Sequence, residues 1–281
     1  MKLLAIDLDG TLLRTNSRIS DYSRNVLNKA LKHDIMIIPA SGRCFRSVMK
    51  LLSEVEGLSY VIGSGGSTIT SVKGKKLIHQ DAFPPKLASE IFHHIFQKNN
   101  FVSINSGNDA YIQRGSEDVM YSCGMDKILC DNLMETYVRL YYLDRSIYRE
   151  ILPVNKICIA SIDPEELSRC LEWLNQFNEV VCNYSTKDIV EISLKKSSKG
   201  NALDLLCNSI NDNFDNQVIS KEDIIAIGDS MIDIDMIQYA HLGIAVDNAM
   251  EEVKKVADRI IASNDEDGPA HLIETIINKI V

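Results

Sequence analysis

Short apolar runs recur along the chain, and each of them ends in polar or glycine-rich residues. The runs cover residues 2–6, 35–40, 60–62, 224–227, 242–246 and 259–262. Apolar runs of this length with polar or turn residues after them are typical of buried strands. Between most of them lie patterns in which apolar residues are three or four positions apart, as on one face of a helix. Strands that alternate with helices predict an α/β fold, with a parallel sheet covered on both faces.

Two of the helical patterns begin after a serine that suits an N-cap. Ser20 precedes an apolar stripe formed by Tyr22, Val26, Leu27, Ala30 and Leu31. Ser197 or Ser198 precedes a second stripe, formed from Lys199 onward by Leu203, Leu206 and Ile210. A serine oxygen accepts a hydrogen bond from the free backbone N–H groups at a helix start. Both stretches are therefore predicted to be helices.

The middle of the chain has a different pattern. From about residue 83 to about residue 188 the alternation is shorter, and hairpin-like stretches occur, such as FVSINSGNDAYIQ with a turn signal at residues 106–109. Pro84-Pro85 is a plausible boundary. We predict a discontinuous core of residues 1–82 and 189–281, and an inserted α+β cap domain of residues 83–188. Two linkers would let such a cap close over a crevice.

Carboxylates follow two of the predicted strands. Asp7 and Asp9 come after the first strand and share a side if the strand continues, while Asp229 and Asp233 come after residues 224–227. Carboxylates held close together repel one another unless a cation lies between them. The ligand crevice of a parallel sheet lies at the carboxyl ends of its strands, so we expect these acids to converge there. Oxygen-only ligation by few protein groups favours Mg²⁺.

Further residues make this site suitable for a phosphoryl group. Lys199 lies at a predicted helix start and Ser41 on a loop with free backbone N–H groups, so both would bind phosphate oxygens. Asp7 would attack phosphorus and form an aspartyl-phosphate. Asp9 would protonate the leaving oxygen and then deprotonate water, which is worth roughly 10²–10⁴ in rate. Taken alone, Asp9-Gly10 also fits a simple turn and Lys199 a solvated lysine.

The composition narrows the class of protein. The 281 residues are 45% hydrophobic and 25% charged, which is typical of a soluble globular protein, and the length favours two domains. A net charge of -9 argues against nucleic acid as a partner, and no stretch approaches the roughly 20 apolar residues of a membrane span. The seven scattered cysteines lack a C-x-x-C pair, so neither a disulfide framework nor a zinc site is indicated. Asp7 and Asp9 interrupt the apolar run at the N-terminus, which argues against a signal peptide. We therefore expect reduced thiols and a cytoplasmic location.

The motifs together resemble those of the haloacid dehalogenase (HAD) superfamily. DLDGT at 7–11, Ser41-Gly42-Arg43, Lys199-Gly200 and Gly228-Asp229…Asp233 are similar, in this order, to its four motifs. The tail, with AVDNAMEEVKKVADRII and then SNDEDG, is similar to the Cof-type phosphatases. The resemblance implies a Rossmann-like parallel-sheet core with a large inserted α+β cap of the C2B type. It also implies a Mg²⁺-dependent phosphatase that acts on a small phosphorylated metabolite, a sugar phosphate or a phosphorylated cofactor.

The resemblance also implies roles for the acids. Asp7 would be the nucleophile and a metal ligand. Asp9 would be the general acid and base, and its backbone carbonyl would bind the metal. Asp229 would complete the magnesium site, and Asp233 would lie in the outer shell of the metal or steady Lys199.

The phosphoryl group itself would be held by residues from three separate segments. By the resemblance, Ser41 and Lys199 bind it, with Gly42 beside Ser41, and Asn248 lies in a matching loop near the site. Arg43 is equally compatible with binding phosphate and with tying down its own loop.

Two positions depart from the family pattern. Ile232 stands where asparagine usually precedes the last motif acid, and Ser64 also replaces a common asparagine. A lost hydrogen bond to a charged group costs on the order of 1.5–3 kcal/mol unless another donor replaces it. A catalytically weakened protein that only binds a phosphorylated ligand is therefore one alternative, and a phosphomutase is another. Neither the physiological substrate nor the oligomeric state follows from the sequence.

Overall fold

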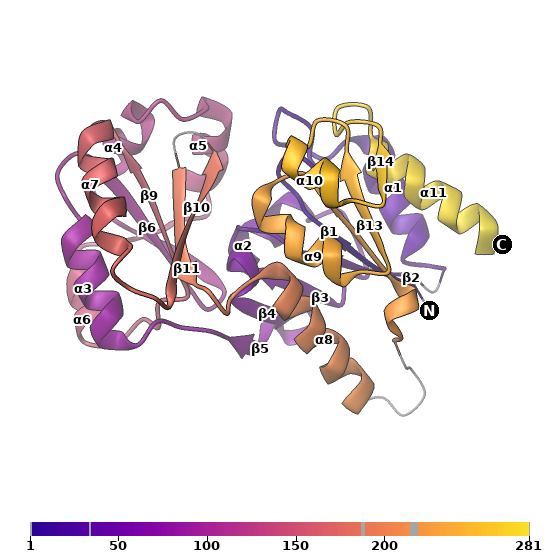
Figure 1. Cartoon of the computed structure of the whole chain (residues 1–281), viewed down its shortest axis with the longest axis horizontal. Helices are drawn as coiled ribbons and strands as arrows, with labels where there is room; N and C mark the ends of the chain where they lie inside the picture. The colour runs from indigo at the N-terminus through magenta and orange to yellow at the C-terminus, as the bar shows by residue number, and fades with distance from the viewer. Residues whose placement is uncertain (1, 34, 187–188, 214–218, 281) are drawn as a thin grey trace.

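A parallel sheet of five strands forms the core of the protein (Figure 1). The structure is a computed structural model that describes residues 2–33, 35–186, 189–213 and 219–280. The sheet contains β1 (Lys2–Ile6), β2 (Ile35–Pro39), β12 (Ile224–Gly228), β13 (Leu242–Val246) and β14 (Arg259–Ile261). The strand order is β14-β13-β12-β1-β2, and every neighbouring pair is parallel. Five of the six apolar runs thus form the predicted α/β sheet.

Helices cover both faces of this sheet, as the alternation of side chains in β1 requires. Leu4 and Ile6 belong to one buried cluster and Leu3 and Ala5 to the other. The first cluster lies under α1 (Asp21–Ala30), α2 (Phe45–Leu51), α10 (Glu251–Val256) and α11 (Gly268–Ile280). The second lies under α8 (Lys199–Asn213), and α9 (Ile234–Tyr239) contributes to both. Within the part of the chain that is described, no helix combines the length and apolarity needed to cross a bilayer.

Both predicted helix starts are confirmed. The Ser20 hydroxyl accepts a hydrogen bond from the backbone N–H of Ser23 at 2.9 Å, and α1 begins at the next residue. The Ser198 hydroxyl accepts one from Asn201 at 3.3 Å, so Ser198 is the cap of α8. The two caps fix where these helices begin, and α8 therefore begins at Lys199.

The sixth apolar run enters a different sheet. Residues 60–62 lie in β3 (Tyr60–Gly63), which pairs antiparallel with β4 (Thr68–Ser71), and β4 pairs with β5 (Lys76–Gln80). A single parallel bridge between Ala40 and Ile62 joins this small sheet to the end of β2. The run is a buried strand, as predicted. The next strand along the chain, β4, pairs with it in an antiparallel hairpin and does not follow a crossover helix.

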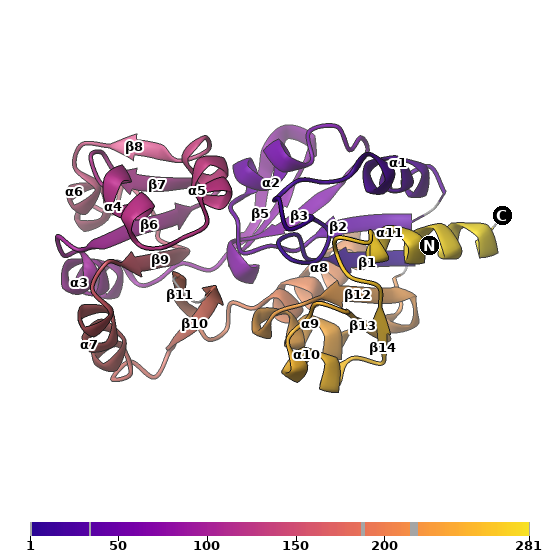
Figure 2. The ribbon, with the colours of Figure 1, turned by 90° about the horizontal axis from the view of Figure 1, so that it is seen from above.

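The inserted part is built on a six-stranded sheet of order β10-β11-β9-β6-β7-β8 (Figure 2). Its strands are β6 (Asn100–Ser106), β7 (Asp109–Gln113), β8 (Val138–Leu140), β9 (Lys156–Ser161), β10 (Val180–Thr186) and β11 (Ile189–Leu194). All pairs are antiparallel except β7 with β8. The predicted turn at residues 106–109 is confirmed, because Ser106 pairs with Asp109 in the β6–β7 hairpin.

Among the described residues, five helices complete this α+β part. On one face of the sheet lie α3 (Pro85–Ile95), α6 (Leu143–Tyr148) and α7 (Pro164–Leu174). On the other lie α4 (Glu117–Ser122) and α5 (Lys127–Met134). The predicted boundary at residue 188 lies outside the described residues. Strand β11 falls in the range predicted for the core, yet it pairs with β9 and β10, so the cap sheet runs to Leu194. A buried antiparallel strand is as apolar as a parallel one, so the residue pattern alone does not tell which sheet this strand joins.

We expect α8 to be held to the sheet by its leucines. Leu206 is 1% exposed within the second cluster, whereas Leu205 on the same helix is 43% exposed. Leu206→Ala should lower the free energy of unfolding by about 2–5 kcal/mol, because it leaves a cavity in a packed core. Leu205→Ala should change it by less than about 0.5 kcal/mol. Urea titration of both variants measures this, and equal losses would contradict the packing described for α8.

Candidate active site

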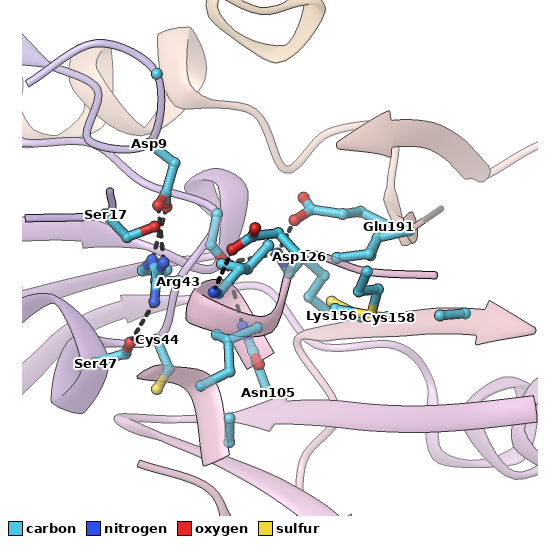
Figure 3. A pocket seen from close by; sticks show the side chains of 18 of the residues that line it. Asp9, Ser17, Arg43, Cys44, Ser47, Asn105, Asp126, Lys156, Cys158 and Glu191 are labelled. Atoms are coloured by element: carbon cyan, nitrogen blue, oxygen red, sulfur yellow. Dashed lines mark hydrogen bonds and ion pairs between the residues drawn. The ribbon is translucent and has the colours of Figure 1, made fainter. Parts of the chain in front are cut away.

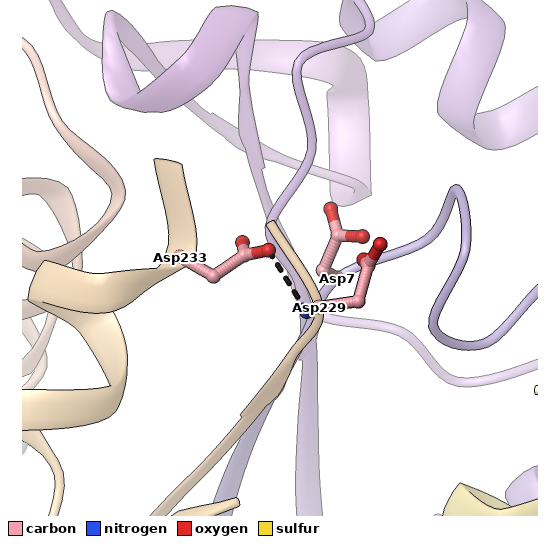
Figure 4. A group of neighbouring side chains, drawn as sticks. All are labelled: Asp7, Asp229 and Asp233. Atoms are coloured by element: carbon pink, nitrogen blue, oxygen red, sulfur yellow. Dashed lines mark hydrogen bonds between the residues drawn. The ribbon is translucent and has the colours of Figure 1, made fainter. Parts of the chain in front are cut away.

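The predicted acids converge at the carboxyl ends of β1 and β12. The two strands are neighbours with Ile6 opposite Ile227, and the Asp7 N–H donates to the Ile227 carbonyl at 3.0 Å. Asp7 and Asp229 therefore leave adjacent strands side by side. Carboxylate oxygens of Asp7, Asp229 and Asp233 lie within 4.8 Å of one another (Figure 4). Asp7 and Asp229 are therefore close enough to bind the same ion.

One buried ammonium group lies within this cluster. Lys199, the first residue of α8, has a side chain that is 0% exposed. Its Nζ donates to Asp7 at 2.5 Å and to Asp233 at 2.6 Å. Lys199 thus contacts two of the three carboxylates, and one ammonium group among three acids leaves the cluster with an excess of negative charge.

The excess of negative charge affects the pKa values of the groups in the cluster. Burial raises the pKa of Asp7 well above its usual range, with the charges of Asp233 and Asp229 adding to the rise and Lys199 opposing it. Burial and then Asp233 raise the pKa of Asp229 to about 6. Burial alone would lower the pKa of Lys199, but the charges of Asp233 and Asp7 outweigh it and raise that pKa. An all-oxygen donor set with surplus negative charge fits a hard divalent cation such as Mg²⁺.

Asp233 uses both of its oxygens on protein donors. One oxygen receives Lys199, and the other accepts from the backbone N–H groups of Asp229 and Ser230 at 3.1 and 3.0 Å and from the Ser230 hydroxyl at 2.9 Å. Asp233 thereby fixes Lys199 and the backbone at Asp229 together. This geometry favours the predicted steadying role, and direct ligation of a metal by Asp233 stays a prediction.

Gly10 and Thr11 hold the carboxylate of Asp229 in place. Gly10 has φ +81°, and a Cβ there would lie 2.5 Å from Oδ2 of Asp229. The Thr11 hydroxyl donates to Oδ1 of Asp229 at 2.7 Å. Only glycine allows so close an approach, so the Asp9-Gly10 pair does more than form a turn. Sequence reasoning missed Thr11, although it lies within the same DLDGT stretch.

Asp9 and Arg43 form a bidentate ion pair. Nε and Nη2 of Arg43 donate to the two carboxylate oxygens of Asp9 at 2.6 and 2.8 Å, and Nη1 donates to Ser47 at 3.3 Å. The Arg43 side chain is 5% exposed and that of Asp9 43%. Arg43 was compatible with binding phosphate or with holding its own loop in place. The contacts in the structure are those of the second role.

The remaining predicted residues have differing surroundings. Ser41 is buried, and its hydroxyl accepts from the Arg43 N–H at 3.2 Å. The Asn248 amide donates to the Gly10 carbonyl at 2.7 Å and accepts from the Asn264 N–H at 2.9 Å. Asn248 therefore joins two backbone loops beside the site, and its contact with substrate stays a prediction.

A cavity of about 480 Å³ opens between these strand ends and the cap sheet (Figure 3). From the core it is lined by Asp7, Asp9, Gly42, Asp229 and Ile232, and from the cap by Asn105, Lys156 and Glu191 among others. The buried Lys156 pairs with Glu191 at 2.7 Å and donates to the Gly42 carbonyl at 2.5 Å. Neither cap residue was predicted, although a lysine and a glutamate inside the apolar strands KICIAS and IVEISL were the available signal.

Comparisons with known proteins agree with this geometry. A family model described as haloacid dehalogenase-like hydrolase matches residues 4–273. Phosphatase YwpJ of Bacillus subtilis (strain 168) is 26% identical over 99% of this chain and 100% of its own. The 5-amino-6-(5-phospho-D-ribitylamino)uracil phosphatase YwtE of the same organism is 28% identical over 99% of both chains. The solved structure of a haloacid dehalogenase-like hydrolase from B. subtilis has a TM-score of 0.80 at 26% identity, and covers 98% of this chain and 99% of that one.

The acidity of Asp229 makes stability depend on pH and metal. Its pKa is raised on folding, so its contribution to stability is full below about pH 4 and is lost as the pH rises through about 6. In EDTA near pH 7.5, Asp229→Asn should therefore be more stable than the wild type by roughly 2–3 kcal/mol, and the gain should vanish near pH 4.

Urea unfolding at the two pH values measures this difference. Added Mg²⁺ should stabilise the wild type and not Asp229→Asn, because ligands that bind only the folded state raise its stability. A variant that is less stable than the wild type in EDTA at neutral pH would contradict the described charge excess.

Proposed function

Because the chain belongs to the family of haloacid dehalogenase-like hydrolases, we propose that it is a Mg²⁺-dependent phosphatase acting on a small phosphorylated metabolite. The observation that carries the proposal is the buried contact of Lys199 with Asp7 beside Asp229, at the ends of two adjacent parallel strands. A carboxylate, a cation and a pair of metal-binding acids at one point are what phosphoryl transfer needs.

In the proposed first step, a carboxylate oxygen of Asp7 attacks phosphorus. The bond from phosphorus to the leaving oxygen breaks, and Asp9, once released from its ion pair with Arg43, gives its proton to that oxygen. In the second step Asp9 takes a proton from water as the water attacks the aspartyl-phosphate, which releases phosphate and restores the Asp7 carboxylate. Lys199 and the loop at Ser41 and Gly42 hold the phosphoryl oxygens throughout.

Mg²⁺ would be held by the carboxylates of Asp7 and Asp229 and the backbone carbonyl of Asp9, and would supply positive charge to the phosphoryl group. The protein orients these groups in advance. Thr11 fixes one oxygen of Asp229, and Asp233 fixes the ammonium of Lys199. Because these partners are buried or part-buried, the acids need little rearrangement when charge develops on the phosphoryl group.

The enclosure of the site supports a small substrate. The cavity lies between the core and the cap sheet, which leaves room for a metabolite and not for a macromolecular phosphoester. The name of the relative YwtE specifies a phosphorylated ribitylamino-uracil. A sugar phosphate or a phosphorylated cofactor is therefore the substrate class that we propose, in a cytoplasmic setting and without nucleic acid as a partner.

The proposal is tested by phosphate release from p-nitrophenyl phosphate and a panel of phosphometabolites, with Mg²⁺ and with EDTA. Asp7→Asn should lower kcat by roughly 10⁴-fold or more, since the nucleophile is lost. Asp247→Asn is the matched control, because Asp247 is an exposed aspartate directly after the neighbouring strand β13. Equal activity of wild type and Asp7→Asn would contradict the role of Asp7. No release from any compound by the wild type would contradict the function.

Ile232 allows a second test. It lines the cavity next to Asp229 and can donate no hydrogen bond from its side chain. Ile232→Asn should raise kcat/KM by about tenfold or more, because a hydrogen bond to a charged group is worth on the order of 1.5–3 kcal/mol. Ile232→Leu changes the shape without adding a donor, so equal gains in both variants would assign the effect to shape. Turnover in Ile232→Asn alone would identify the wild type as a binding protein.

A further inference from the structure

We propose that Asp81 is a positioning residue, which ties the two linkers of the cap to each other and thereby keeps Lys199 in place when the cap opens. The inference rests on the proposed phosphatase function, because that function gives Lys199 the task of holding the phosphoryl group. It adds a residue outside the cavity lining, and it follows from the contacts of the linkers.

Two linkers join the core to the cap, and the second leads directly into the active site (Figure 1). Residues 81–84 connect β5 with α3, and residues 195–198 connect β11 with α8. Lys199 is the first residue of α8, so it follows the second linker without a gap. Linker residues absorb the change in backbone angles when a lid opens. A bend in residues 195–198 therefore displaces Lys199 unless these residues are held.

The carboxylate of Asp81, in the first linker, holds the second linker at two residues. Nζ of Lys196 lies 2.5 Å from one of its oxygens, and the Ser197 hydroxyl donates to the other at 3.2 Å. Nε2 of His79 lies 3.4 Å from this second oxygen. Burial alone would raise the pKa of Asp81, but Lys196 and His79 outweigh it and lower that pKa. Asp81 is therefore ionised at neutral pH, and its charge strengthens both contacts with the second linker.

The backbone of Asp81 is fixed to both halves of the molecule. Its N–H donates to the Ser67 carbonyl of the core at 2.8 Å, and its carbonyl accepts from the buried Asn155 amide of the cap at 2.7 Å. Two residues later, the Phe83 N–H donates to the Val154 carbonyl of the cap at 2.8 Å. Asp81 is thus a fixed point between core and cap, and what its carboxylate holds stays close to that point.

The second linker is also attached to the first turn of α8. The Asn201 side chain donates to the Lys196 carbonyl at 2.9 Å, and the Asn201 N–H donates to the Ser198 hydroxyl at 3.3 Å. A Cβ at Gly66 would lie 2.1 Å from the Ser198 carbonyl oxygen, so the core leaves the linker no room to shift in this direction. A displacement of Lys196 is therefore passed on to Lys199.

Asp81→Asn tests the inference, because it removes the charge and keeps the size of the side chain. It should lower kcat/KM for acetyl phosphate and p-nitrophenyl phosphate about tenfold or more, since a small misplacement of a positioned group is costly. It should also raise the inhibition constant of inorganic phosphate about fivefold or more, because phosphate loses part of a charge-assisted contact with Lys199. Acetyl phosphate offers the cap little to contact. Losses confined to larger phosphometabolites would mean that Asp81 acts on cap closure alone, and would overturn the inference.

Two further variants provide the controls. Lys196→Met breaks the same ion pair from the partner whose side chain is 67% exposed, and it should change both constants in the same direction. Glu135→Gln makes the matched change in an exposed ion pair between cap and core that involves neither linker, the pair with Lys50. It should change both constants by less than about twofold, since exposed pairs contribute little. Losses in Glu135→Gln equal to those in Asp81→Asn would assign the effect to a loosened cap and overturn the inference.

Hydrogen exchange gives a readout that does not depend on turnover. The backbone amides in the first turn of α8 should exchange about fivefold faster or more in Asp81→Asn than in the wild type, because local opening sets the rate. They should exchange at the wild-type rate in Glu135→Gln. The inference requires both readouts, so wild-type exchange or wild-type constants in Asp81→Asn would overturn it. Thermal unfolding identifies a variant that has lost its fold, and Lys196→Met then decides.

The outcome is separable from that of the proposed function. If the wild type hydrolyses neither acetyl phosphate, p-nitrophenyl phosphate nor any phosphometabolite, the phosphatase proposal fails, and the role of Asp81 in the reaction fails with it whatever the exchange rates. If the wild type is active and Asp81→Asn matches it, only the inference about Asp81 fails.

Discussion

The arrangement of the core depends on one buried ammonium group. Lys199 lies between Asp7 and Asp233, and all three side chains are almost or fully shielded from water. A buried charge without a partner costs several kcal/mol, so the start of α8 has to meet the ends of β1 and β12 at this point. The neighbouring Gly66 makes the approach sterically feasible, since a Cβ there would lie 2.1 Å from the Ser198 carbonyl oxygen. Segments far apart in sequence are joined here by charge as well as by apolar packing.

The sequence predicted those parts of the molecule that depend on local order. Apolar runs of strand length and the caps at Ser20 and Ser198 depend only on residues near in sequence, and the structure contains both. The meeting of Asp7 with Asp229 was also predictable. Parallel strands place their carboxyl ends at one edge, so polar residues after such strands come together whatever lies between them. The roles of the predicted residues in catalysis are a separate matter and stay predictions.

The sequence did not allow us to predict which strands and side chains pair when they lie far apart in the chain. Strand β3 (Tyr60–Gly63) and strand β11 (Ile189–Leu194) are apolar like their neighbours, and only tertiary pairing decides which sheet takes them. Lys156 donates to the carbonyl of Gly42, which is 114 positions away in the sequence. Arg43 donates to the carboxylate of Asp9, which is 34 positions away. The contact of Lys156 depends on the packing of the cap on the core, and that of Arg43 on the packing of two loops within the core. Lys156 and Glu191 of the cavity were therefore missed, although they are visible as charges inside apolar strands.

The distribution of charge also bears on how a substrate reaches the site. Each buried cation near the cavity is paired within its own half of the molecule: Lys199 and Arg43 with core acids, and Lys156 with Glu191 in the cap. The ion pairs between the halves, Arg46 with Asp109 and Lys50 with Glu135, are largely exposed, and exposed pairs are worth about 0–1 kcal/mol. The two halves can therefore separate without leaving a buried charge unpaired. Separation would break the hydrogen bonds from Lys156 and Asn105 to the Gly42 carbonyl, so closing the cap fixes the loop proposed to hold phosphate.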